Sequence, residues 1–387
     1  MTKYFKLYIL FLFFSITGFS QISKVHYIPP LTNNKSLSGG SSIPLDQYMY
    51  LSTPSENNVT VTITPLNGDS PTTYNNLSNG NPIRYDIGTS WNGTNYTPSQ
   101  LFVDHETTGG NTALNAGFVV EADCPIYVSI RYNAGAQAGA LVSKGDASLG
   151  TNFRAGMMTN GTVQSANAHF TANSFFSVMA TQDNTIVSID LPNALIGETT
   201  LSNYNYQGPF TKVLQKHESM VLSLDFENTN ANNQGARNSL NGALIRSVDE
   251  DGTEDGTKPL VVNVGSASGS FSATGSGHDH GIDQIVGLDR VGHEYIFVRG
   301  NGQNLNDGGQ LETPLIISTK DNTHLYINGS TTATATIDAG DIWLATSDLW
   351  SSQNQGATMY IRTQDKNYPV YAYQGIAGNG DSEANQG

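Results

Sequence analysis

Three copies of one short pattern constrain the fold of this chain more than any other feature of its sequence. Each copy has Asp or Asn, then Asn, then an alternating stretch, at residues 57–63, 183–189 and 321–327. The two polar residues favour a turn, because their side chains bond the nearby backbone and tolerate left-handed conformations. The alternation that follows predicts a strand with one buried face. The matching buried positions are Val61, Val187 and Leu325.

Further landmarks accompany each copy in the same order. An apolar strand precedes the turn, and the two strands together predict a β-hairpin. Later in each copy, Leu or Ile stands before a tight turn. Each copy then ends with a short strand that opens at glycine and a strand headed by proline, which predict a second hairpin because proline fits the first residue of a strand. The positions are Tyr48–Leu51, Phe175–Met179 and Leu315–Ile317; Leu77, Leu214 and Ile337; Gly117, Gly242 and Gly356; and Pro125, Pro259 and Pro369.

These landmarks predict an all-β protein built from three tandem, repeated β-sandwich-like units. The expected divisions are residues 21–142, 143–275 and 276–380. Each unit would hold about seven strands, a size that suits a sandwich with its own core. Abundant Gly and Tyr and only 13% charged residues also favour strands over long helices with paired charges. The alternative architecture is one β-propeller with two blades per unit, because radial repetition also protects strand edges.

The first twenty residues predict export. Lys3 and Lys6 precede an apolar run from Leu7 to Phe14, and small residues stand at Gly18 and Ser20. This is the pattern of a secretory signal peptide, with cleavage after Ser20. The run is shorter than the roughly 18 residues that span a bilayer, so we expect no membrane insertion. The predicted location is therefore secreted or at the cell surface.

Charge and cysteine content limit the partners and the source of stability. The formal net charge of −15 opposes binding to nucleic acid or anionic lipid. Cys124 is the only cysteine, so no intrachain disulfide can form, and we expect this thiol to be a structural, unreactive group. The partners that remain open are extracellular proteins, glycans and cations.

An acidic tract at residues 249–256 is the densest polar cluster. It lengthens the closing hairpin of the second unit, where Asp249, Asp251 and Asp255 would be the ligands if the protein binds calcium. Calcium takes six to eight oxygen ligands, but the spacing differs from that of the twelve-residue helical calcium loop. A solvated loop tip is the other interpretation. No other cofactor is expected.

No motif in the sequence predicts an enzyme. The nucleophile-elbow pattern is absent, and the glycines around His278 and His280 indicate a loop rather than a zinc site. A glycosidase needs only two carboxylates about 5 to 10 Å apart, so a secreted carbohydrate-active enzyme remains the main catalytic alternative. Trp343 and Trp350 could then bind sugar, although core packing explains Trp343 equally well.

The ordered landmarks resemble the N-terminal domain of the IgGFc-binding protein family. The residues that carry the resemblance are Gly292-His293-Glu294-Tyr295, Asp321-Asn322-Thr323 and Pro369-Val370-Tyr371, and it spans roughly residues 40 to 380. It is strongest to versions at the front of very long surface proteins of Bacteroidetes, many exported by the type IX route. The resemblance implies non-catalytic adhesion or binding, with a protein or glycan ligand and no catalytic residues.

The end of the sequence predicts further domains. Proteins of this kind in that bacterial group usually carry a C-terminal sorting module, whereas here residues 381–387 follow the third unit directly. We therefore expect this tail to be the start of a longer chain. A structural spacer of a surface filament is a third possible function, although a spacer gains nothing from the uneven loop lengths.

Overall fold

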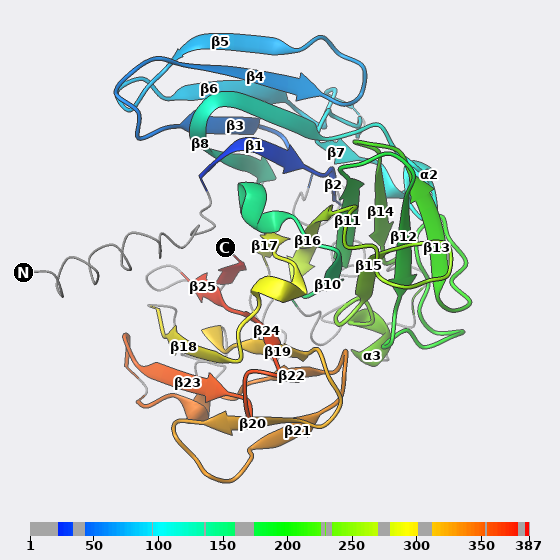
Figure 1. Ribbon diagram of the computed structural model, residues 1–387, viewed down its shortest axis with the longest axis vertical. Helices are drawn as coiled ribbons and strands as arrows, with labels where there is room; N and C mark the ends of the chain where they lie inside the picture. Colours follow the sequence, from blue (N-terminus) through cyan, green and yellow to red (C-terminus); the bar gives the residue numbers. More distant parts are fainter. Residues whose placement is uncertain are drawn as a thin grey trace, which may run out of the picture.

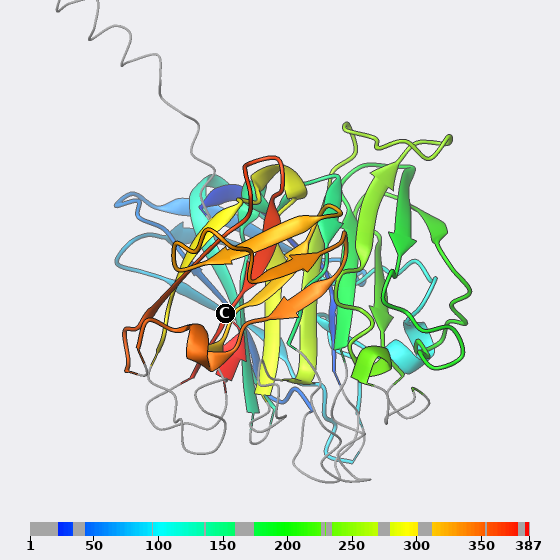
Figure 2. The same ribbon diagram turned by 90° about the horizontal axis from the view of Figure 1, so that it is seen from below.

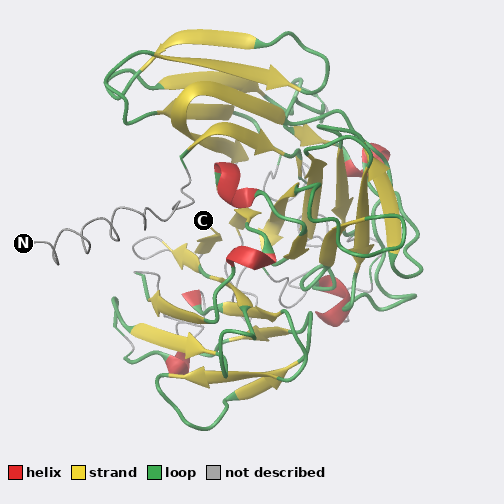
Figure 3. Ribbon diagram, in the orientation of Figure 1, coloured by secondary structure: helices red, strands yellow, loops and turns green. Residues whose placement is uncertain are grey.

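The computed structural model shows an all-β protein, in which short helical turns connect the strands (Figure 3). The structure describes residues 22–33, 43–94, 96–134, 137–158, 174–225, 229, 234–269, 279–300, 312–352, 354–377 and 384–386. The predicted signal peptide and its cleavage site lie outside these residues. The strands form three sets that follow one another along the chain, and Figure 1 shows them in an arc with the first at the top, the second at the right and the third at the bottom.

The N-terminal set is one seven-stranded sheet that curls into a nearly closed, barrel-like form. Its strands are β1 (Ser23–Ile28), β3 (Gln47–Ser52), β4 (Val59–Pro65), β5 (Thr72–Leu77), β6 (Ile83–Gly88), β8 (Phe118–Ala134) and β9 (Gln137–Val142). The long strand β8 joins the two halves, because its first part pairs with β1 and β4 and its second part pairs with β3 and β9. Two short strands, β2 (Leu31–Thr32) and β7 (Phe102–Val103), pair in parallel beside it.

The middle set consists of two four-stranded sheets that share one hydrophobic cluster. One has the order β10-β15-β12-β13 and the other β14-β11-β16-β17. Their bounds are β10 (Asn152–Arg154), β11 (Ser174–Ala180), β12 (Thr185–Asp190), β13 (Phe210–Leu214), β14 (Ser219–Ser223), β15 (Leu244–Val248), β16 (Leu260–Gly269) and β17 (Asp279–Ile285). β17 follows the expected division at residue 275 but pairs with β16.

The C-terminal set has the sheets β18-β23-β20-β21 and β22-β19-β24. Their bounds are β18 (Glu294–Val298), β19 (Leu315–Ser318), β20 (Thr323–Ile327), β21 (Ala335–Ile337), β22 (Ile342–Leu344), β23 (Thr358–Arg362) and β24 (Val370–Tyr373). A last pair, β25 (Gly375–Ala377) and β26 (Ala384–Gln386), ends the described chain. The short helices are α2 (His105–Thr108) and α3 (Gln234–Arg237), with 3-10 turns at Gly145–Ser148, Leu288–Arg290 and Ser347–Leu349.

The predicted buried face is confirmed at all three turn patterns. Val61 on β4, Val187 on β12 and Leu325 on β20 are fully buried. Asn184 and Asn322, in the turns before β12 and β20, adopt the left-handed conformation with φ of 53° and 56°. The local chemistry of the turn and the strand period therefore agree with the sequence.

The predicted hairpins are wrong. β3 pairs with β6 and β8, whereas β4 pairs with β5 and β8, so the two strands around the first turn are not partners. The same holds for β11 and β12, for β19 and β20, and for the closing strands β15 and β16. In the middle and C-terminal sets each turn instead carries the chain from one sheet to the facing sheet, and in the N-terminal set it carries the chain from one half of the curled sheet to the other. Alternation marks the buried side of a strand, but two strands that face one core across a sandwich have the same pattern as two hydrogen-bonded neighbours.

Each crossing at the turn pattern is closed by the same hydrogen bond. A threonine hydroxyl donates to the carbonyl oxygen of the proline that heads the closing strand, at 3.0, 2.6 and 2.5 Å. The pairs are Thr53 with Pro125, Thr181 with Pro259 and Thr319 with Pro369. The bond therefore joins the end of β3, β11 and β19 to the proline-headed segment that pairs with it in the same sheet, next to each turn pattern.

The sheet β14-β11-β16-β17 is buried on both faces. Phe176 and Val178 belong to the core shared with β12, while Phe175 and Ile282 belong to the core of the N-terminal sheet. The C-terminal set repeats this arrangement, because Ile316 lies in its own core and Ile317 lies in the core of the middle set. Figure 2 shows the middle set beside the C-terminal set, with the strands of the N-terminal set behind the latter. Each set after the first is thus packed onto the set before it.

Candidate binding site

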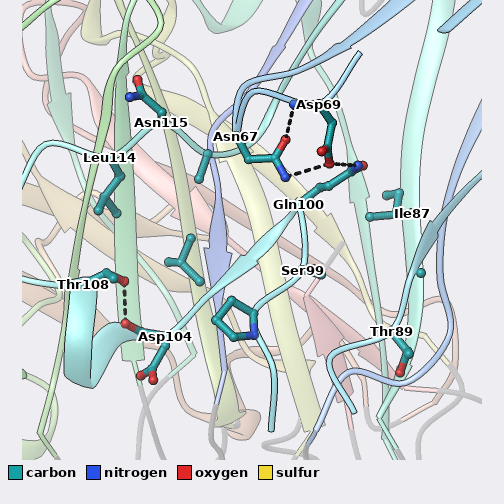
Figure 4. Close-up of a pocket in the computed structure, with 14 residues that line it drawn as sticks. Asn67, Asp69, Ile87, Thr89, Ser99, Gln100, Asp104, Thr108, Leu114 and Asn115 are labelled. Carbon is teal, nitrogen blue, oxygen red and sulfur yellow. Dashed lines mark hydrogen bonds between the residues drawn. The ribbon is translucent and has the colours of Figure 1, made fainter. Parts of the chain in front are cut away.

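A surface pocket of about 530 Å³ lies where the N-terminal sheet meets the middle set (Figure 4). Its wall comes from the turn after β4, the end of β6, the segment that contains β7 and α2, and the segment that leads to β8. The lining residues are Asn67, Asp69, Ile87, Gly88, Thr89, Pro98, Ser99, Gln100, Val103, Asp104, Thr108, Leu114, Asn115 and Ala116. Most of these stand in loops, which is where binding residues concentrate on a rigid β scaffold.

Asp69 is the centre of a polar network on one wall. Its Oδ2 accepts hydrogen bonds from the side-chain amides of Asn67 at 2.9 Å and Gln100 at 2.7 Å (Figure 4). The Tyr85 hydroxyl donates to Gln100 Oε1 at 3.3 Å and fixes the orientation of that amide. The bonds from Asn67 and Gln100 lower the pKa of Asp69. The wall therefore presents an ionised carboxylate held by two amides.

Asp104 forms the opposite wall and begins α2. Its Oδ1 accepts the backbone N–H of Glu106 at 3.0 Å, and its carbonyl oxygen accepts the Thr108 hydroxyl at 2.6 Å. An aspartate at this position satisfies backbone donors that the first turn of a helix leaves free. Ser99, between the two walls, donates to Gln47 at 2.7 Å and accepts from the backbone of Phe102 at 2.9 Å.

Apolar side chains at the junction of the two sets form the floor. Val103 and Ala116 are buried in one small cluster with Val221 of β14, and Leu114 packs on this cluster. The backbones of Leu114 and Ser219 exchange two hydrogen bonds, at 2.7 and 2.9 Å. The floor is consequently rigid, because residues from both sets hold it.

The described lining of the pocket offers polar groups for binding. Among the described residues that line it there is no His, Cys, Lys or Arg, and Ser99 donates its proton to an amide rather than to a base. A glycosidase needs one protonated carboxyl as general acid. The hydrogen bonds to Asp69 favour the opposite, ionised state. None of the described lining residues carries an aromatic ring that could stack on a sugar.

Sequence reasoning did not find this pocket. Its residues come from several loops between positions 67 and 116, and none stands in a motif. The turn Asn67-Gly68-Asp69 has the composition of any exposed β-turn, so it carried no distinguishing signal. Only the fold of the seven-stranded sheet brings this turn beside Gln100.

The acidic tract lies between β15 and β16, at an exposed connection between sheets rather than at a hairpin tip. Asp249 and Asp251 both accept hydrogen bonds from Thr253, whereas Asp255 accepts from Thr257 and lies 3.8 Å from Lys258 Nζ. Within the described part of the chain, no three His, Cys, Asp or Glu side chains gather as a metal site. Calcium binding by Asp249, Asp251 and Asp255 stays a prediction.

The other described residues named in the sequence analysis lie in the core or on the surface, and none of them lines the pocket. His280 is fully buried beside Asn33 and the ring of Tyr132, and burial lowers its pKa to about 3. His278 lies outside the described residues. Trp350 is buried in the core of the C-terminal set, and Trp343 packs against that core. Cys124 is exposed on β8, so the expectation of a thiol with a packing role is wrong.

The fold and the pocket define an all-β protein of layered sheets with a polar surface pocket. Residues 138–387, about two thirds of the chain, match the family described as IgGFc binding protein. The chain therefore belongs to this family, which is a family of binding domains and not of enzymes. No curated protein matches the chain. The pocket precedes the matched residues.

None of the helices in the described part of the chain is long and apolar enough to cross a bilayer.

Proposed function

We propose that this protein is an extracellular, non-catalytic adhesion module that binds a protein ligand outside the cell. The family match over residues 138–387 is the observation that carries the proposal. The predicted signal peptide supports export, and the surface-protein context of Bacteroidetes and the type IX route remain part of the proposal. A glycan is the alternative ligand, since the pocket offers amide, hydroxyl and carboxylate groups.

The proposal includes three related units, with divisions near residues 142 and 285. The support is the strand order, because β18-β23-β20-β21 matches β10-β15-β12-β13 strand for strand. The first half of the N-terminal sheet has the corresponding order β1-β8-β4-β5.

The pocket is the proposed contact for the ligand. It combines an apolar floor with amide and carboxylate groups that are held in fixed orientations, and this combination is typical of a specific binding site. Asp69 and Asp104 would accept hydrogen bonds from backbone or side-chain donors of a partner. The ionised state of Asp69 favours a cationic or N–H-rich partner surface over an anionic one.

The test uses immunoglobulin G Fc and a glycan array as probes. The exported chain is immobilised, and binding of glycosylated Fc, deglycosylated Fc and the array is measured. A protein ligand predicts equal binding of both Fc forms, whereas binding lost on deglycosylation or seen on the array assigns a glycan. Absence of binding to Fc and to a panel of secreted proteins would overturn the protein-binding proposal.

A matched pair of variants tests the pocket itself. Asn115→Trp fills the pocket from an exposed position, and Asn354→Trp places the same side chain on an exposed turn of the C-terminal set. Only Asn115→Trp should weaken binding, by at least tenfold. Equal affinities for the two variants would remove the pocket from the interface.

The catalytic alternative has its own measurement. Glycan turnover by the pure protein that is lost on Asp69→Asn and on Asp104→Asn would establish a glycosidase in place of the binding module. We expect no turnover, because the hydrogen bonds to Asp69 favour its ionised state, which cannot donate a proton to the leaving group.

A further inference from the structure

The two junctions between strand sets are built in the same way. At the first, Asn263 of β16 donates to the carbonyl oxygen of Pro29 at 2.9 Å, just beyond β1. At the second, Tyr373 of β24 donates to the carbonyl oxygen of Arg154, in β10, at 3.5 Å. Asn263 and Tyr373 are each the fourth residue after the proline that heads the closing strand. At each junction, one face of a sheet in the following set thus packs against the edge strand of the preceding set.

The edge strands also match in register. Tyr27 of β1 pairs with Val119, and Arg154 of β10 pairs with Leu244, each two residues beyond the opening glycine. In each case the side chain is covered by the tight turn of the following set, which comes after Leu214 in the middle set and after Ile337 in the C-terminal set. The ring of His217 lies 6.0 Å from the ring of Tyr27, and Gly340 lies against Arg154.

Within the described residues, the third edge strand, β18, has no such cover. Val298 pairs with Thr358, two residues beyond Gly356, and therefore holds the register position of Tyr27 and Arg154. Val298 is 50% exposed and Ile296 on the same face is 70% exposed. A Cβ on Gly242 would lie 2.0 Å from the Gly340 oxygen, whereas one on Gly356 would meet nothing within 4 Å. We name Ile296, Val298 and Gly356 the free edge.

The face that would cover such an edge is itself uncovered in the N-terminal sheet. Tyr127 is the second residue after Pro125, the position that Val261 and Tyr371 hold in the buried faces of the later sets. Tyr127 is 42% exposed and Tyr50 is 38% exposed. The guanidinium of Arg84 lies 4.8 Å from the ring centre of Tyr48 on the same face. We name Tyr48, Tyr50 and Tyr127 the free face.

We propose that the free edge of one copy of this chain docks on the free face of a second copy, head to tail. The interface continues the two junctions already inside the chain, so no new kind of packing is required. Edge and face are different surfaces, and the contact is therefore heterologous, which gives either a closed ring or an open filament. The proposal does not depend on the ligand of the pocket.

The exposed side chains fit this role. Burial of exposed aliphatic side chains such as Ile296 and Val298 by a partner removes them from water and so stabilises the complex. Tyrosines are favoured at interfaces because an apolar ring carries a polar hydroxyl. Among the described strands β18 pairs only with β23, and edge strands of this kind are common sites of pairing with another chain.

Sedimentation velocity over a range of concentrations tests the proposal. The exported chain should self-associate as concentration rises. The edge variant, Ile296→Asp with Val298→Asp, and the face variant, Tyr50→Asp with Tyr127→Asp, should each remain monomeric. Val213→Asp changes an equally exposed apolar residue on β13, is 49% exposed in the wild type, and should leave association unchanged.

Mixing the two variants gives the decisive result. The edge variant keeps an intact face and the face variant keeps an intact edge, so the mixture should form one-to-one dimers and nothing larger. Thermal melts of each variant check that the fold is retained. A wild type that stays monomeric at every concentration would overturn the proposal, and so would a mixture of folded variants that does not associate.

Discussion

β3 and β19 hold corresponding places in their sheets, yet one face of β3 is exposed and β19 is buried throughout. Tyr50 of β3 and Leu315 of β19 both stand on the face turned away from the core of their own set. Tyr50 is 38% exposed, and Leu315 is fully buried in the core of the middle set. The comparison teaches that packing between sets, rather than position in the sheet, decides which side chains a strand tolerates.

The sequences of the strands record this difference. β3 alternates as Gln-Tyr-Met-Tyr-Leu-Ser, whereas β19 reads Leu-Ile-Ile-Ser and β14 reads Ser-Met-Val-Leu-Ser. A strand that is covered on both faces loses its alternation, because no side points to water. The continuous apolar runs therefore mark the sheets that lie between two cores.

The largest expected effect comes from the opening glycines. Gly242 and Gly356 both have positive φ, of 82° and 77°, but only Gly242 faces the backbone of the next set. Gly356→Ala should cost about 1 kcal/mol of unfolding free energy from the backbone conformation alone. Gly242→Ala adds a clash with Gly340 and should cost about 3 kcal/mol or more. Urea denaturation measures the unfolding free energy of both variants. Equal losses of stability would contradict the claim that only Gly242 is packed against the next set.

Substitution of the two corresponding residues, Leu315 and Tyr50, gives the next largest expected change in stability. Leu315→Ala leaves a cavity between the middle and C-terminal sets and should cost about 2 to 5 kcal/mol. Tyr50→Ala removes a half-exposed ring and should change stability by about 1 kcal/mol or less. Thermal melts of dilute protein, in which any association is absent, compare the pair. A large loss for Tyr50→Ala would mean that the free face is covered within the same chain.

Acid should weaken the junction between the N-terminal and middle sets. Burial lowers the pKa of His280 from 6.5 to about 3. Between these values the unfolded chain binds a proton that the folded chain does not, so stability falls as pH falls below about 6.5, by up to about 1.4 kcal/mol per pH unit. His280→Gln should flatten the slope of stability against pH, and His293→Gln serves as the control. A slope unchanged by His280→Gln would contradict the assignment.

The smallest effect belongs to the ion pair at the same junction. Lys144 contacts the Asp283 carboxylate and the Gln284 carbonyl oxygen, and both charged side chains are partly exposed. Partly exposed ion pairs contribute about 0 to 1 kcal/mol and weaken with salt. Lys144→Gln should thus cost less than about 1 kcal/mol, with a smaller cost in high salt. A larger, salt-independent loss would show that the carbonyl contact dominates.

The sequence predicted less of the candidate site than of the fold. The acidic tract was conspicuous because its charges are adjacent, whereas Asp69 and Gln100 of the pocket stand 31 positions apart. A pocket made by loops has no period and no fixed spacing, so its members are visible only after the sheet has folded. Tyr127 likewise stands in the strand headed by Pro125, and no local pattern shows that its side chain is exposed.

The sequence by itself determined the all-β class, the turns before β4, β12 and β20, and the buried side of each of these strands. Turn chemistry and strand period are local, and local properties can be read from adjacent residues. Only the tertiary structure decided which strands are partners, because the hydrogen bonds of a sheet join backbone groups that nearly every residue has. It also decided that Asn263 and Gln284 meet the carbonyl oxygens of Pro29 and Tyr27, more than 230 positions away. Those contacts depend on how one folded set packs on another, and no local pattern specifies that.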